Sequence, residues 1–250
     1  MVLTKKGGSK HLKRLAAPAF WPILKKEYRW VTKPSPGPHP LGRCIPLLIL
    51  VRDMLKLAEN AREAKRIIFD GEVLVDSKVR RNFKLPVGLM DVVSIPRIDV
   101  HVRIIPHTIK YLWYVGVPKE EVNLKLVRIE NKSLIKGNRL QLNLHDGRNI
   151  LISREESQKY KTLDGLLIEI PSQKIVQHIP LEVNKLAIVM DGRNAGRIGR
   201  IIEIQEKPGM SRRKFLVTLE EASGHRFQTI LEYVMVIGDD KPIIKVSEGT

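Results

Sequence analysis

The stretch from Leu140 to Ile152 constrains the fold of this chain more than any other segment. Apolar and polar residues alternate strictly from Leu140 to His145, Asp146-Gly147 follows, and an apolar run returns after Asn149. An alternation with period two places every second side chain on the same face of a strand, and Asp-Gly is a typical two-residue hairpin turn. The sequence therefore predicts a β-hairpin whose turn is Asp146-Gly147.

Looser alternation on both sides of this hairpin extends the β prediction to most of the chain. We expect further strands within residues 124–129, 166–170 and 175–179, followed by a barrel of about five strands that begins after residue 181. A chain of 250 residues suits two or three small domains better than one large core.

Residues 46–70 have a helical pattern instead. Apolar residues recur every three or four positions between 46 and 58, which predicts an amphipathic helix. Asn60 followed by Glu63 resembles a capping box, so a second helix is expected to begin at Ala61. Its outer face would then present Arg62, Lys65 and Arg66 together.

A short hairpin is predicted after the second helix. Gly71 is placed to end that helix, and Asp76-Ser77 forms the turn between residues 73–75 and 78–81. The returning strand adds cations beside the helix, and residues 89–95 read as a buried strand. Together these elements predict a small α+β unit with one cationic face.

The positive charge is concentrated at the N-terminus. The formal net charge is +17, and residues 1–43 contain ten basic residues and one acid, a net +9. Aromatic residues lie among these cations, and the proline-rich residues 33–40 should run extended. Such a segment is either a solvated tail or one that orders against RNA, where rings stack on bases and cations pair with phosphates. The aromatic residues favour RNA.

Three glycines at 192, 196 and 199 raise the possibility of a phosphate-binding loop. A P-loop would end in Gly-Lys-Ser/Thr and precede a helix, whereas Arg200 here leads into a β-branched strand. The dinucleotide-binding fingerprint also fails on its spacing. The segment is better explained as a strand–turn–strand that presents Arg193, Asn194, Arg197 and Arg200.

Other classes of site lack the residues that they need. The single cysteine, Cys44, allows no internal disulfide and is expected to be packed and unreactive. The seven histidines lack metal-ligand spacing, so we expect no metal and no cofactor. No nucleophile or facing acid pair indicates an enzyme. No apolar run is long enough to span a membrane, so we expect an intracellular protein.

Two segments resemble known motifs. Residues 64–93 resemble the RNA-binding module shared by small-subunit ribosomal protein four and pseudouridine synthases, and residues 191–200 resemble a KOW motif. Their order, together with residues 11–18, 36–39 and 142–149, makes the whole chain similar to the archaeal/eukaryotic (e-type) family of small-subunit ribosomal protein four. Asp76 departs from the Asn of many related modules, so we expect no direct RNA contact from that turn.

This resemblance implies a mostly β protein with a small α+β RNA-binding module, arranged as three small domains after a basic extension. The expected limits are an extension at 1–42, the RNA-binding module at 43–98, a central β domain at 99–180, and a KOW-type, SH3-like barrel with the C-terminal tail at 181–250.

The implied function is that of a non-enzymatic constituent of the small (30S-type) ribosomal subunit in the cytoplasm. Its partners would be small-subunit ribosomal RNA and neighbouring ribosomal proteins, with no membrane and no homo-oligomer. A KOW-containing transcription elongation factor or an accessory of an RNA-modifying enzyme is the alternative. The predicted RNA contacts are Lys5, Lys6, Lys10, His11, Lys13, Arg14, Arg62, Lys65, Arg66, Lys78, Arg80, Arg81, Arg193, Asn194, Arg197 and Arg200.

Overall fold

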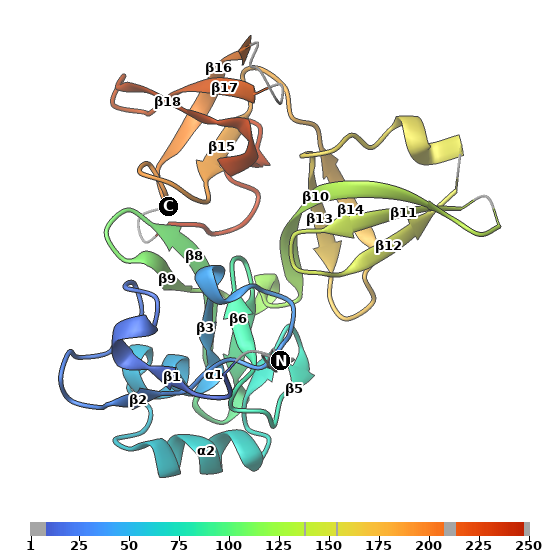
Figure 1. Cartoon of the computed structure of the whole chain (residues 1–250). Helices are drawn as coiled ribbons and strands as arrows, with labels where there is room; N and C mark the ends of the chain where they lie inside the picture. The colour runs from blue at the N-terminus through green and yellow to red at the C-terminus, as the bar shows by residue number, and fades with distance from the viewer. Residues whose placement is uncertain (1–8, 138, 154, 208–213, 248–250) are drawn as a thin grey trace, which may run out of the picture. The chain divides into compact units, whose positions relative to one another are not determined.

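The computed structural model describes residues 9–137, 139–153, 155–207 and 214–247. It divides into two compact units: unit 1 lies within residues 1–73 and 79–88, and unit 2 within residues 74–78 and 89–250. Strands greatly outnumber helices, which confirms the predicted fold class (Figure 1). Short 3-10 turns occur at Arg14–Ala16, Leu41–Arg43, Pro96–Ile98, Lys119–Glu121, Glu155–Gln158 and Leu231–Tyr233.

The first predicted helix of unit 1 is shorter and wider than expected. Helix α1 (Leu47–Ile49) continues into a π-helical turn (Leu50–Met54). The N–H of Leu55 donates to a carbonyl five residues back. Lys56 then has a φ of 54°, a left-handed conformation that stops a helix. The helix therefore ends at residue 54 and not at residue 58.

The second helix, α2 (Ala61–Phe69), begins where the sequence predicts. The Asn60 side chain accepts hydrogen bonds of 3.0 Å from the N–H groups of Arg62 and Glu63. The carboxylate of Glu63 accepts from the N–H of Glu59 instead of that of Asn60, which modifies the expected capping box. The inner face of α2 buries Ala64 and Ile68.

The described part of the N-terminal extension packs onto the helices and strands of unit 1. Trp21 is only 2% exposed, and its indole N–H donates to the carbonyl of Cys44 at 2.8 Å. His39 is buried against Gly88, where an added Cβ would lie 2.3 Å from the imidazole. Two short antiparallel pairs complete the unit: β1 (Leu12–Lys13) with β2 (Trp30–Val31), and β3 (Cys44–Pro46) with β6 (Pro86–Gly88).

The first sheet of unit 2 has the order β5-β4-β7-β8-β9. Asp76 and Ser77 both have positive φ and form the predicted turn of its first hairpin. The predicted boundary between residues 98 and 99 falls inside this sheet, because β7 and β8 are paired. The domain limits stay a prediction. The strands are β4 (Leu74–Val75), β5 (Lys78–Val79), β7 (Val92–Ile95), β8 (Val100–His107) and β9 (Tyr111–Gly116).

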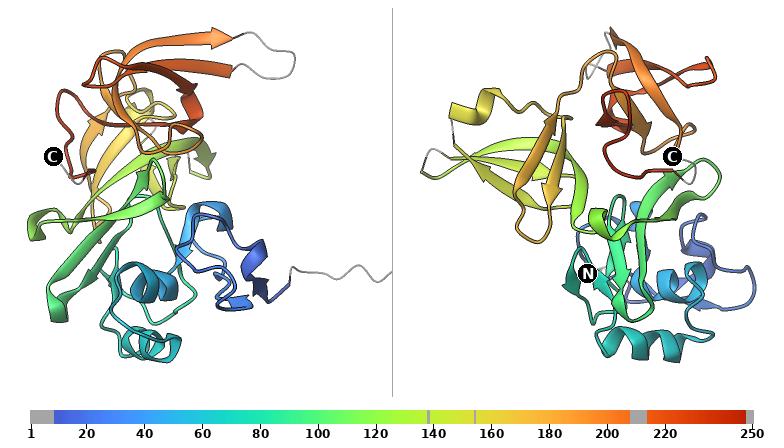
Figure 2. Two further views of the ribbon diagram at one scale, coloured as in Figure 1. Left: turned by 90° about the vertical axis from the view of Figure 1, so that its left-hand side faces the viewer. Right: turned by 180° about the vertical axis from the view of Figure 1, so that it is seen from behind.

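The central sheet has the order β12-β11-β10-β13-β14 and is organised by its longest strand, β10 (Leu124–Ile135). The first half of β10 pairs with β13 and the second half with β11, with an irregularity after Ile129. Figure 2 shows this long strand from two sides. The remaining strands are β11 (Arg139–Leu144), β12 (Asn149–Ile152), β13 (Gly165–Glu169) and β14 (Ile175–Ile179).

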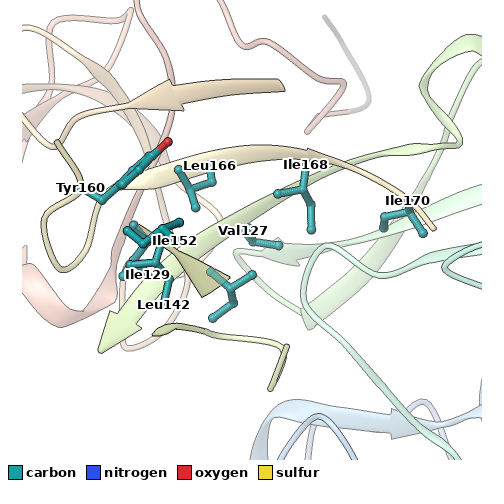
Figure 3. Close-up of a cluster of buried hydrophobic side chains, with 9 residues drawn as sticks. Val127, Ile129, Leu142, Ile152, Tyr160, Leu166, Ile168 and Ile170 are labelled. Carbon is teal, nitrogen blue, oxygen red and sulfur yellow. The ribbon is translucent and has the colours of Figure 1, made fainter. Parts of the chain in front are cut away.

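Side chains of β10 and of the neighbouring strands form a hydrophobic core (Figure 3). Val127 and Ile129 lie on the same face of the strand and contribute to it, as the alternation requires. The other members come from the neighbouring strands and the loops that join them: Leu142, Leu144, Ile152, Tyr160, Leu166, Ile168 and Ile170.

The predicted hairpin joins β11 to β12, but its turn lies one residue earlier than expected. The N–H of Gly147 donates to the carbonyl of Leu144, so His145 and Asp146 are the central residues of the turn. Within this turn only Gly147 has positive φ. A two-residue type I′ turn would need positive φ at both Asp146 and Gly147, whereas this three-residue loop needs it only at the glycine.

The C-terminal sheet of unit 2 has the order β18-β17-β16-β15-β19, with β15 paired to both β16 and β19. Arg128 of β10 is buried, and its guanidinium donates to the carbonyls of Glu232 and Val234, which attaches this sheet to the central one. The strands are β15 (Leu186–Val189), β16 (Ile198–Lys207), β17 (Lys214–Glu220), β18 (Arg226–Ile230) and β19 (Val234–Gly238).

Unit 2 also contains a buried ion cluster, made of Lys125, Arg148, Asp76, Asp91 and Asp146. The ammonium of Lys125 lies 2.7 Å from Asp76, 2.5 Å from Asp91 and 3.0 Å from Asp146. Arg148 pairs with Asp76 and, at 3.0 Å, with Asp146. Because these residues come from the first sheet and the central sheet, the cluster joins the two sheets.

Candidate nucleic-acid interface

The cations of α2 are placed as the sequence predicts. Ala64 and Ile68 face inward, so Arg62 and Arg66 are exposed on the opposite side, and Lys65 is half-buried. The Lys65 ammonium lies 4.8 Å from the centre of the Phe83 ring. Arg66 is 3.9 Å from Asp70, at the limit of an ion pair, whereas Arg62 has no carboxylate partner among the residues that the structure describes. This face is therefore open to a polyanion.

The predicted cations after the Asp76-Ser77 turn are accessible to different degrees. Lys78 and Arg81 are exposed, and Arg80 is half-buried with its Nε atom buried and unpaired. Neither Lys78 nor Arg81 meets a carboxylate within the described ranges. Asp76 itself points into the buried ion cluster, where it pairs with Lys125 and Arg148, and the expected absence of an RNA contact at this turn stays a prediction.

The N-terminal cations divide into exposed and structural residues. Lys10, His11 and Lys13 are exposed, and the imidazole of His11 lies 5.4 Å from the Trp30 ring. Arg14 instead donates to the carbonyl of Ile23, at 2.6 Å and 3.2 Å, and so helps to fold the extension. The predicted contacts Lys5 and Lys6 lie outside the described residues.

Two of the three arginines in the turn at residues 191–200 have carboxylate partners within unit 2. Gly192 and Gly196 have φ of 83° and 82°, as a tight bend requires. Arg197 lies 3.6 Å from Glu221, and Arg200, at the start of β16, lies 2.7 Å from Asp240. The amide of Asn194 donates to the carbonyl of Gln228. Arg193 is exposed and, among the described residues, lacks a carboxylate partner.

The structure therefore separates cations that are free from cations that are already paired. An RNA phosphate that contacts Arg197 or Arg200 must compete with a carboxylate, whereas one that contacts Arg62 or Arg81 does not. Since exposed ion pairs are weak, at most about 1 kcal/mol, this competition reduces the contribution of the turn without excluding it. That the cations of the extension, of the helix pair and of this turn all contact one RNA stays a prediction.

Two features of the structure are not predicted from the sequence. One is the buried ion cluster, because its members are far apart in the chain. The other is the contact between Arg52 and Tyr28, whose ring centre lies 5.6 Å from the guanidinium carbon. The aromatic residues among the cations of the extension indicate that such a contact can form. The sequence around them does not indicate that their partner lies on the first helix.

The described parts of the chain provide neither a metal-binding cluster nor a membrane-spanning helix. No group of three or more His, Cys, Asp and Glu side chains is placed to bind a metal ion. Among the described helices, none combines the length and the apolar character needed to cross a membrane. Cys44 is buried, in agreement with the expectation that it is packed.

Fold and charge together define a basic, predominantly β protein built from several small sheets. Comparison with known proteins identifies the family within this class. Residues 98–175 match the model of the ribosomal family S4e, and residues 6–42 match that of the RS4NT (NUC023) domain. This chain belongs to the S4e family of ribosomal proteins, since its full length is shared with curated members at about half identity.

Several of the similar proteins match this chain from end to end. The small ribosomal subunit protein eS4 of Staphylothermus marinus is 50% identical, covering 99% of both chains, and that of Ignicoccus hospitalis is 52% identical, covering 97% of both. The crystal structure of the 30S ribosomal protein S4e from Thermoplasma acidophilum matches 79% of this chain and 96% of its own, at 31% identity and a TM-score of 0.66.

Proposed function

We propose that this protein is a structural constituent of the small ribosomal subunit and binds folded small-subunit RNA. The observation that carries this proposal is the end-to-end identity of about one half with proteins named small ribosomal subunit protein eS4. The protein is non-enzymatic in this role. It lies on the ribosome in the cytoplasm, beside other small-subunit proteins.

The free cations of unit 1 supply the mechanism. Arg62, Arg81 and the exposed lysines of the extension neutralise phosphates that a folded RNA brings close together. Each neutralised phosphate releases counterions, so the logarithm of the affinity falls with the logarithm of the salt concentration, by about 0.7 to 0.9 per contact. Recognition rests on RNA shape and 2′-hydroxyl groups more than on base identity.

The KOW-type turn at residues 191–200 is a second, weaker contact in this proposal. Arg193 is its most available cation, because Arg197 and Arg200 have carboxylate neighbours. A transcription elongation factor or an accessory of an RNA-modifying enzyme gains no support from the match to the ribosomal family S4e or from the similarity to eS4 proteins.

Sedimentation tests the proposal directly. The native protein is expected to travel with the small subunit at low salt and to be released only at high salt. Sedimentation with RNA polymerase, or release from the subunit already at low salt, would contradict it.

A further inference from the structure

Unit 1 contains a hollow of about 490 Å³ between the N-terminal extension, the first helix and the start of α2. Its volume falls in the range of pockets that bind small organic groups. Ile23 and Ile49, both buried, form part of the lining. The extension also contributes Tyr28 and Trp30. In Figure 1 the extension is the dark blue segment that includes β1 and β2.

The aromatic residues of this hollow are accessible, in contrast to Trp21 of the same segment. Tyr28 is 50% exposed and Trp30 is 51% exposed, whereas Trp21 is almost completely buried. Trp21 therefore anchors the extension, while Tyr28 and Trp30 leave ring surface uncovered. Exposed aromatic rings that lie next to cationic side chains are the surfaces on which unstacked bases pack.

Cations surround these rings, and the lining contains no acid. Arg52 is held by two hydrogen bonds to the Asp53 carboxylate, at 3.0 Å and 2.9 Å, with its guanidinium over Tyr28. Arg29 and Lys13 lie 5.4 Å and 6.0 Å from the Trp30 ring. Arg62 lines the hollow and, among the described residues, has no carboxylate partner. The cations therefore favour an occupant that carries negative charge.

We propose that this hollow binds one unstacked nucleotide of the ribosomal RNA, with its base against Tyr28 and Trp30 and its phosphate at Arg62. The inference rests on the proposed function and makes it specific. The phosphate pairs with the Arg62 side chain and not with the start of α2, because the Asn60 side chain already accepts hydrogen bonds from the N–H groups of residues 62 and 63. An uncharged peptide would leave these cations unused.

Substitution of both rings by leucine separates stacking from charge. The Tyr28→Leu/Trp30→Leu chain keeps apolar side chains and every cation, so its affinity for a small-subunit RNA transcript should fall by about 5- to 150-fold, the effect of losing one base–aromatic stack. Its salt dependence should change by no more than one phosphate contact. The matched control is Tyr114→Leu, a partly exposed ring of β9 that does not line the hollow, which should bind like the parent.

Photocrosslinking of the unaltered chain gives a second measurement that does not depend on how the variant folds. After irradiation of the complex with the same transcript, mass spectrometry should find a nucleotide on Tyr28 or Trp30. Parent-like affinity of the double variant, or crosslinks only at other aromatic residues, would overturn the nucleotide site while leaving the proposed function intact. Failure of the parent chain to bind the transcript and to sediment with the small subunit would instead overturn the proposed function.

Discussion

The ammonium of Lys125 lies 2.7 Å from the carboxylate of Asp76, in the interior of unit 2. Lys125 belongs to β10 of the central sheet, and Asp76 belongs to the turn between β4 and β5. This contact is therefore one of those that join the two sheets. Burial alone would lower the pKa of Lys125, but the carboxylates of Asp91, Asp76 and Asp146 raise it above its ordinary value. The lysine is therefore charged in the folded protein.

Replacing Lys125 by methionine should destabilise the protein strongly. The change keeps an unbranched side chain but leaves three buried carboxylates with only Arg148 as a cation, and breaking a buried ion pair costs about 3–5 kcal/mol. The free energy of unfolding from urea titration measures the loss. Lys119→Met is the matched control, because Lys119 is exposed and its ion pair with Asp99 is worth at most about 1 kcal/mol. Similar losses in the two variants would contradict the importance of burial.

The same cluster predicts a pH dependence that Asp146 controls. Burial tends to raise the pKa of this carboxyl group, but Lys125, His145 and Arg148 lower it below its ordinary value. The unfolded chain therefore binds the proton at a higher pH, near 4, so the stability contributed by Asp146 is complete above about pH 5 and is lost as the pH falls through the folded pKa. The difference in unfolding free energy between the parent and Asp146→Asn should be constant from pH 5 to 7 and shrink below pH 4. A difference that stays constant down to pH 2 would contradict this.

Local features of the fold could be predicted from the sequence because their causes lie within a few residues. The Asn60 cap acts on N–H groups two and three positions later, and Asp76-Ser77 forms its turn alone. The surface position of Arg62 follows from helical periodicity in the same way. Long-range contacts could not be predicted. Lys125 and Arg128 lie three positions apart, on opposite faces of the strand, yet both are buried because β10 is covered on both faces.

The same limit applies to the candidate site. The sequence predicts that the turn at residues 191–200 presents cations, but the carboxylates that pair with them come from other parts of the sheet. Glu221 follows β17 and Asp240 follows β19, about 25 and 40 residues further along the chain. No local pattern indicates such a pairing, so the sequence overestimates the charge that this turn offers to RNA.

The distinction between free and paired arginines is itself testable. Arg81→Gln should lower the slope of log affinity against log salt by about 0.7 to 0.9, because an exposed cation without a carboxylate partner within the described ranges is removed. Arg226→Gln removes the same charge from a residue that lies 3.0 Å from Glu220 and should change the slope less. Filter binding of a small-subunit RNA transcript over a salt series measures both. Equal slopes for parent and Arg81→Gln would exclude Arg81 from the interface.

The two tryptophans of the N-terminal extension should differ in their effect on stability. Trp21→Ala removes a buried ring and its hydrogen bond to Cys44, and should cost about 3–5 kcal/mol of unfolding free energy. Trp30→Ala removes a ring that is half exposed, so its cost should be much smaller, within about 0.5 to 1 kcal/mol. Urea unfolding followed by circular dichroism compares them. A larger loss for Trp30→Ala would show that Trp30, and not Trp21, anchors the extension.

Gly196 is required for close packing as well as for the conformation of its own turn. An added Cβ would lie 2.6–2.7 Å from the backbone of His107 and Thr108, at the end of β8, so only glycine allows the two turns to approach. Gly224 provides the matched control, since its φ of 81° nearly equals the 82° of Gly196 but no atom lies within 4 Å of the added Cβ. Gly224→Ala should show the backbone cost alone, about 1 kcal/mol, and Gly196→Ala should exceed it by about 1–3 kcal/mol, because the backbone of the facing turn must move. Thermal or urea unfolding measures the difference. Equal losses of unfolding free energy would mean that the facing turn can shift without destabilising the protein. Gly196 would then be required only for its positive φ.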